Sequence, residues 1–152
     1  MKKILIASDH AGFELKKEFI KNYQHLPWED LGTHDTQSVD YPDFAAKLCE
    51  KLIAAAGSLS VTEDAFKADV CGVLICGSGQ GMAIKANKYP QIRAALCWNE
   101  EVARLSRQHN NANILCIGAR AIPGDVAQKT LIAFLSSAFE GGRHSQRVAK
   151  LC

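Results

Sequence analysis

The stretch VCGVLICGSGQGMAIKANK, residues 70–88, decides the fold. Its first seven residues form an apolar run that ends in Cys76, which is typical of a buried strand. Three glycines follow at every second position, and a helix is predicted from about Gly81. A buried strand that turns through glycines into a helix is typical of α/β proteins.

The same alternation extends in both directions along the chain. Short apolar runs predict four more strands at 2–8, 27–32, 92–98 and 113–118, of which 27–32 is the weakest. Apolar residues at helical spacing predict helices around 15–23, 44–53 and 102–105 and within 122–139. Five strands that alternate with helices predict an α/β fold with a parallel sheet covered on both faces.

The remaining segments indicate a single domain over residues 1–152. The connection 54–70 has no clear period and predicts a surface loop that could hold one helical turn. The sequence contains no internal repeat, no low-complexity segment and no sign of a second domain. A chain of 152 residues with 47% hydrophobic residues is long enough to bury one core.

Composition excludes several classes of partner. Eighteen basic and sixteen acidic residues give a formal charge of +2, which is too even for nucleic-acid binding but leaves anionic small molecules possible. No stretch is long enough to span a bilayer, and the first apolar run ends at Asp9, so we expect no membrane contact and a cytoplasmic location. The six cysteines form no CxxC pair and no Cys/His zinc spacing, which predicts reduced thiols and no metal.

Ligands of parallel sheets bind beyond the carboxyl ends of the strands, so the residues there are candidates for a site. They include acids, bases, a thiol and an arginine: Asp9, His10, Gly32–His34, Cys76–Gly81, Asn99 and Gly118–Arg120.

The glycine loop itself admits three interpretations. A dinucleotide site would use Glu100 or Glu101 for a ribose, but the spacing is GxGxG and the loop follows the third predicted strand. A tight turn without a ligand also fits. In the third interpretation Cys76, next to the start of a helix, is a thiolate base. The loop amides would then stabilise the oxyanion formed when a proton α to a carbonyl is removed.

Two further clusters suit that third interpretation. His109 and Asn110 stand just before the fifth strand, and either histidine, His10 or His109, could equally be structural. Arg143 and Arg147 are four residues apart, so a helix would place them on one face, where they could bind a phosphate or simply face solvent.

Six short motifs resemble, in order and spacing, the type B ribose-5-phosphate isomerases and their galactose-6-phosphate relatives. The motifs are DHAG (9–12), DYP (40–42), CGSGQGMAIKANK (76–88), LSRQHNNAN (105–113), GAR (118–120) and EGGRHSQRV (140–148). The resemblance implies a three-layer Rossmann-like sandwich with a five-stranded parallel sheet. It implies an enzyme of the pentose phosphate pathway that interconverts ribose 5-phosphate and ribulose 5-phosphate through a cis-enediolate, without cofactor.

The resemblance also implies residue roles. Cys76 is the base, Ser78 assists at the sugar hydroxyls, and His109 with Asp9 opens the ring. Some relatives carry a glutamate base after the loop, but MAIKANK contains no acid. The remaining residues contact the enediolate, the sugar or the phosphate: Gly77, Gly79, Gly81, Tyr41, Asn110, His10, Arg120, Arg143 and Arg147.

The family's site lies between subunits, which implies a homodimer or homotetramer. We expect one chain to supply Asp9, Cys76 and the Arg143/Arg147 pair, and its partner to supply His109, Asn110 and Arg120. The connection from about 57 to 69 is longer than is usual in the family. Three alternatives stay open: a hexose 6-phosphate substrate, a nicotinamide-dependent oxidoreductase, and a non-catalytic sugar-phosphate sensor.

Overall fold

The computed structural model describes residues 1–58 and 60–151 and contains one five-stranded parallel sheet in the order β2-β1-β3-β5-β4. Leu59, in the long connection, and Cys152 lie outside the described residues. The strands are β1 (Lys3–Ser8), β2 (Trp28–Asp30), β3 (Val70–Cys76), β4 (Ala94–Leu96) and β5 (Ile114–Gly118). The helices are α1 (Phe13–Asn22), α2 (Tyr41–Ala56), α3 (Gln80–Ala86), α4 (Glu100–Asn110), α5 (Gly124–Ser136) and α6 (Arg143–Val148), with a 3₁₀ turn η1 at Ala65–Ala68.

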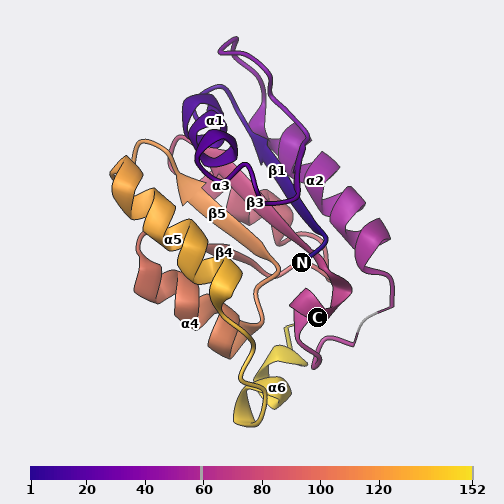
Figure 1. The fold of residues 1–152 in the computed structure, drawn as a ribbon. Coiled ribbons are helices and arrows are strands. Elements are labelled where there is room, and N and C mark those ends of the chain that lie inside the picture. The colour runs from indigo at the N-terminus through magenta and orange to yellow at the C-terminus, as the bar shows by residue number, and fades with distance from the viewer. Residues whose placement is uncertain (59, 152) are drawn as a thin grey trace.

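Helices cover both faces of the sheet, which makes three layers (Figure 1). Helices α2 and α3 pack on one face, against side chains such as Leu5 and Leu74. Helices α1, α4 and α5 pack on the other, against alternate residues such as Ile4 and Val73. All seven residues of β3 are buried, because this central strand is covered on both faces. The predicted α/β three-layer sandwich is confirmed.

The two edge strands are shorter than predicted. β2 and β4 span three residues each, whereas the apolar runs covered 27–32 and 92–98. An edge strand pairs on one side only, so ladder hydrogen bonds end before the apolar pattern does. No helix among residues 1–58 and 60–151 combines the length and hydropathy needed to cross a bilayer.

Steric constraints explain why glycines follow β3. Gly79 has a φ of +77°, and a Cβ there would lie 2.9 Å from the backbone nitrogen of Gly118. A Cβ on Gly81 would lie 2.5 Å from the ring of Tyr41. Side chains at either position would therefore collide with neighbours, and only glycine lets the loop close down between β5 and α2.

The long connection is anchored at the amino end of the sheet. It contains the predicted single turn, η1, but Ala65 is buried and the Phe66 ring meets Phe134 edge-on. Asn111 caps α4 in the left-handed region, with a φ of +52°, and accepts a 2.8 Å hydrogen bond from the Ala65 N–H. The connection is thus a surface segment with one helical turn, as predicted, and it is anchored to the rest of the chain through Ala65 and Phe66.

A buried ion pair completes this anchor. The Arg107 side chain is fully buried, pairs with Asp64, and lies 3.6 Å from the Phe66 ring centroid. Its guanidinium also donates to the Ala112 carbonyl at 2.5 Å. The second Asp64 oxygen accepts a 3.0 Å hydrogen bond from the Phe139 N–H. Arg107 and Asp64 therefore tie the connection to α4 and to the segment that precedes α6.

Candidate active site

Cys76 ends β3 at the carboxyl edge of the sheet, directly before the glycine loop. Its Sγ accepts a 3.1 Å hydrogen bond from the Gly79 N–H, and the residue is 4% exposed. This hydrogen bond fixes the position of the sulfur at the start of the glycine loop. The loop thus presents a sulfur base and backbone donors within one short turn.

The other described cysteines are poor candidates for a base. Burial raises the pKa of Cys49 and Cys71 to about 12 and that of Cys97 to about 11. Burial also raises the pKa of Cys116 well above the ordinary value of a thiol. Burial keeps these four thiols protonated near neutral pH, including Cys97, which directly follows β4.

Asp9 and His10 follow the end of β1, which pairs with β3. The Asp9 N–H donates to the Ile75 carbonyl at 3.1 Å, next to Cys76 in the neighbouring strand. One Asp9 carboxylate oxygen accepts from the N–H groups of Ala11 at 2.9 Å and Gly12 at 3.0 Å, which fixes its position. His10 Nδ1 accepts from the Val39 N–H at 3.3 Å.

Arg120, Ser78 and Tyr41 complete this edge. The Arg120 N–H donates to the Gly77 carbonyl at 2.9 Å, and Gly77, Ser78 and Arg120 line a shallow cavity of about 340 Å³. Tyr41, at the start of α2, lies over Gly81. We call the residues gathered here the thiol cluster: Asp9, His10, Tyr41, Cys76, Gly77–Gly81 and Arg120.

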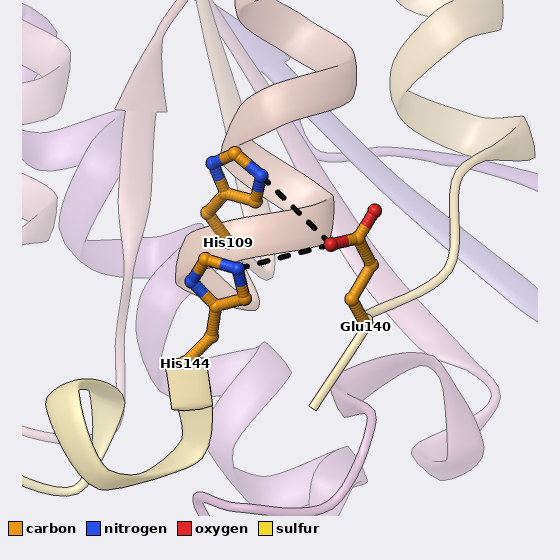
Figure 2. Close-up of side chains that lie close together, drawn as sticks. All are labelled: His109, Glu140 and His144. Carbon is orange, nitrogen blue, oxygen red and sulfur yellow. Dashed lines mark ion pairs between the residues drawn. The ribbon is translucent and has the colours of Figure 1, made fainter. Parts of the chain in front are cut away.

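The other predicted residues lie at the opposite, amino edge of the sheet. His109 and Asn110 end α4, and α6 packs against that last turn (Figure 1). The His109 and His144 rings stack with centroids 4.3 Å apart, and each Nε2 faces Glu140 Oε2, at 3.9 and 3.8 Å (Figure 2). We call the residues gathered here the histidine cluster: His109, Asn110, Glu140, Arg143, His144 and Arg147.

Two members of the histidine cluster were missed by sequence reasoning. Glu140 and His144 stand in the EGGRHSQRV motif, and their four-residue spacing beside the arginine pair was the available signal. Burial, and then the positive charge of His109 and Arg143, lower the pKa of His144, which favours its neutral form.

Helix α6 confirms that Arg143 and Arg147 lie one turn apart. Both are exposed, and no carboxylate of residues 1–58 and 60–151 lies within ion-pairing distance of either guanidinium. The charges therefore remain available to an anion.

Within one chain, the structure groups these residues differently from the predicted division between subunits. Arg120 lies beside Gly77 in the thiol cluster, because it follows the carboxyl end of β5. Arg143 and Arg147 lie with His109, because α6 packs on the last turn of α4. Strands of five to seven residues separate the two edges by roughly 15–20 Å, more than a pentose phosphate can bridge.

The sequence matches the model of one protein family over almost its whole length. The family model described as Ribose/Galactose Isomerase covers residues 4–151. The chain belongs to the ribose/galactose isomerase family. It is therefore an isomerase with the fold that its motifs predicted, and the oxidoreductase and sensor alternatives have no support.

Relatives of this family match over nearly the full chain. Ribose-5-phosphate isomerase B of Escherichia coli is 39% identical, with 97% of this chain and 93% of the relative covered. A crystal structure of the Thermotoga maritima ribose 5-phosphate isomerase superimposes with a TM-score of 0.85 at 46% identity, covering 98% and 96% of the two chains. The Mycoplasma genitalium enzyme, solved with bound ribulose-5-phosphate, gives 0.81 at 39% identity over 98% and 93%.

Proposed function

We propose that this isomerase interconverts ribose 5-phosphate and ribulose 5-phosphate without a cofactor. The observation that carries the proposal is the Cys76 sulfur, held 3.1 Å from the Gly79 N–H at the mouth of the glycine loop. The names of the relatives, and the ribulose 5-phosphate bound to the Mycoplasma genitalium enzyme, support the pentose substrate. The proposal includes the cytoplasm, since a free thiol base needs a reducing compartment.

The thiol cluster supplies the proton transfer. Cys76 as thiolate removes the C2 proton of the open-chain aldose, and the electron pair forms the C1–C2 double bond of a cis-enediolate. Backbone N–H groups of Gly77–Gly81 stabilise the charge that develops on the sugar oxygen. Ser78 passes a proton from O2 to O1, and Cys76 returns its proton to C1, which gives the ketose.

The histidine cluster supplies ring opening and part of phosphate binding. His109 protonates the ring oxygen while Asp9 accepts the proton of the anomeric hydroxyl. Arg143 and Arg147 bind the phosphate dianion, and two planar guanidiniums one turn apart suit its geometry. Asn110 and Tyr41 contact the sugar, and Arg120 and His10 contact the phosphate from the side of the thiol cluster.

These two sets of residues belong to different edges of one chain, so the proposed reaction needs two copies. A two-fold dimer would bring the thiol cluster of one chain against the histidine cluster of the other, twice. We therefore propose a division in which one copy supplies Asp9, Cys76 and Arg120, and its partner supplies His109, Asn110, Arg143 and Arg147.

Mixing two inactive variants tests the shared site. Cys76→Ala and His109→Ala are each expected to be inactive, but subunit exchange should restore about a quarter of the wild-type rate. The reason is that half of the dimers are mixed, and each mixed dimer keeps one intact site. The measurement is the isomerase rate after co-refolding; a mixture no more active than its components would place each site within a single chain.

Replacing Arg143 with alanine is expected to weaken substrate binding. A charge-assisted contact with phosphate is worth roughly 1.5–3 kcal/mol, or about ten- to a hundredfold in KM, with a much smaller change in kcat. Steady-state kinetics measure both constants. Lys150→Ala, which removes an exposed charge just beyond α6, is the control, and an unchanged KM for Arg143→Ala would contradict the phosphate role.

A panel of aldose phosphates tests the proposed function itself. With no cofactor added, ribose 5-phosphate should be turned over with a higher kcat/KM than allose 6-phosphate or galactose 6-phosphate. A preference for either hexose phosphate would show that the substrate is a hexose 6-phosphate and not ribose 5-phosphate. Absence of turnover with all three would contradict the proposal.

A further inference from the structure

The histidine cluster contains three potential metal ligands that the proposed reaction does not use together. His109 Nε2, His144 Nε2 and Glu140 Oε2 all lie within 4.8 Å of one another (Figure 2). We propose that these three atoms bind a divalent transition cation of the zinc type, and that the bound cation reversibly inhibits the enzyme.

The spacing of the three atoms is close to that of a coordinated ion. Tetrahedral bonds of about 2.0–2.2 Å place ligand atoms roughly 3.3–3.6 Å apart. Glu140 Oε2 lies 3.9 Å from His109 Nε2 and 3.8 Å from His144 Nε2, so these two pairs must close by only a few tenths of an ångström. The two Nε2 atoms lie within 4.8 Å of each other and must close by at most about 1.5 Å. A metal lies in the plane of each imidazole, so the rings, now stacked at 11°, must tilt toward each other.

The backbone holds the three residues together while leaving two side chains free to adjust. The Glu140 N–H donates to the Gln108 carbonyl at 3.0 Å, which fixes the segment against α4. The His144 side chain is 9% exposed and so is held in place, whereas those of His109 and Glu140 are 38% and 50% exposed. A cation can therefore enter from solvent, and a short rotation of His109 completes the site.

The ligand types determine which ion fits. Two imidazoles and one carboxylate suit Zn²⁺, Co²⁺ and Ni²⁺, whereas Mg²⁺ and Ca²⁺ prefer all-oxygen sites. Three protein ligands leave a fourth position open for water. The nearby charges of Arg143 and Arg147 oppose a cation, so we expect moderate affinity and easy release rather than a resident metal.

Inhibition follows from the identity of one ligand. His109 is the ring-opening acid, and this consequence rests on the proposed function. A metal on its Nε2 removes the proton that ring opening requires. The metal and a closed-ring substrate therefore compete for the same imidazole.

Cobalt titration of the purified protein tests binding without reference to activity. One Co²⁺ per chain should give the visible absorption of a low-symmetry nitrogen and oxygen site, without the near-ultraviolet band of cobalt thiolate. Loss of a residue that only hydrogen-bonds to a metal ligand weakens metal binding roughly 10–100-fold. Glu140→Gln and His144→Gln each remove a direct ligand, so each should weaken Co²⁺ binding by at least that factor. His25→Gln, which removes an exposed histidine elsewhere, should leave binding unchanged.

Each outcome of the cobalt titration either supports or contradicts the metal site. Binding lost in both variants and kept in His25→Gln supports the site. A thiolate band, no saturable binding, or binding retained in Glu140→Gln would overturn it. Glu140 is half-exposed, so the Glu140→Gln variant should fold even if His144→Gln, which replaces a buried side chain, does not.

Isomerase assays with Zn²⁺ then test the inhibition. Zinc should lower the ribose 5-phosphate rate in wild type, chelation should restore it, and Glu140→Gln should need at least about ten times more zinc. Inhibition equal in both proteins would overturn the inhibitory role. If the metal-free protein shows no isomerase activity, the proposed function fails, while the cobalt titration still decides the site.

Discussion

The Cys76→Ala variant should lose nearly all isomerase activity and keep its affinity for the sugar phosphate. A positioned proton-transfer group contributes about 10²–10⁴-fold to a rate, so kcat is expected to fall by that factor. Binding should change little, because the arginines that hold the phosphate are untouched. The kcat comes from ribulose formation, and affinity comes from calorimetry with ribose 5-phosphate on the inactive variant.

Two controls separate the role of Cys76 from a general effect of losing a thiol. Cys49→Ala removes a fully buried thiol from α2 and should leave kcat unchanged. Cys76→Ser keeps the shape of the side chain but carries a hydroxyl that is barely ionised near neutral pH, so it should be nearly as slow as alanine. Turnover at the wild-type rate in Cys76→Ala would remove Cys76 from the mechanism.

The Asp64→Ala variant should be strongly destabilised although Asp64 lies far from the thiol. Removing one partner of a buried ion pair leaves an uncompensated charge and typically costs about 3–5 kcal/mol. Here the charge left behind is Arg107, which is fully buried against Phe66 and Phe134. Urea denaturation measures the loss in the free energy of unfolding.

The Asp64–Arg107 pair also predicts how the stability of a double variant differs from that of a surface control. Asp64→Ala combined with Arg107→Met removes both charges and should recover much of the lost stability, because apolar replacement of a buried pair is often neutral. Lys129→Ala breaks an exposed ion pair with Asp125 and should cost about 0–1 kcal/mol. Equal losses in Asp64→Ala and Lys129→Ala would show that the buried pair is not what holds the connection.

The Asp64 carboxylate also makes stability depend on pH. Burial alone would raise the pKa of Asp64, but the N–H groups of Phe66 and Phe139 and the charge of Arg107 together lower it. A lowered folded pKa contributes stability above the unfolded value, about 4, that is lost as the pH falls through the folded value. Wild type should therefore lose more stability on acidification below about pH 4 than Asp64→Ala/Arg107→Met does.

The buried elements were predicted well because their pattern reflects burial directly. β1, β3 and β5 consist mostly of apolar residues, and their ends lie within one residue of the predicted runs. The long connection was described only as a loop, because its anchors are distant in sequence. Its Asp64 pairs with Arg107, 43 residues away, and no local period reports such a contact.

By itself, the sequence determined the parallel sheet, the glycine loop next to Cys76 and the family, since each depends on neighbours within a few residues. Only the tertiary structure decided that α6 packs on the end of α4. This packing brings Glu140 and His144 against His109 and sets Arg143 and Arg147 at the edge of the sheet opposite Cys76. The physical reason is that the packed residues are distant in sequence, and a local pattern reports only contacts between near neighbours.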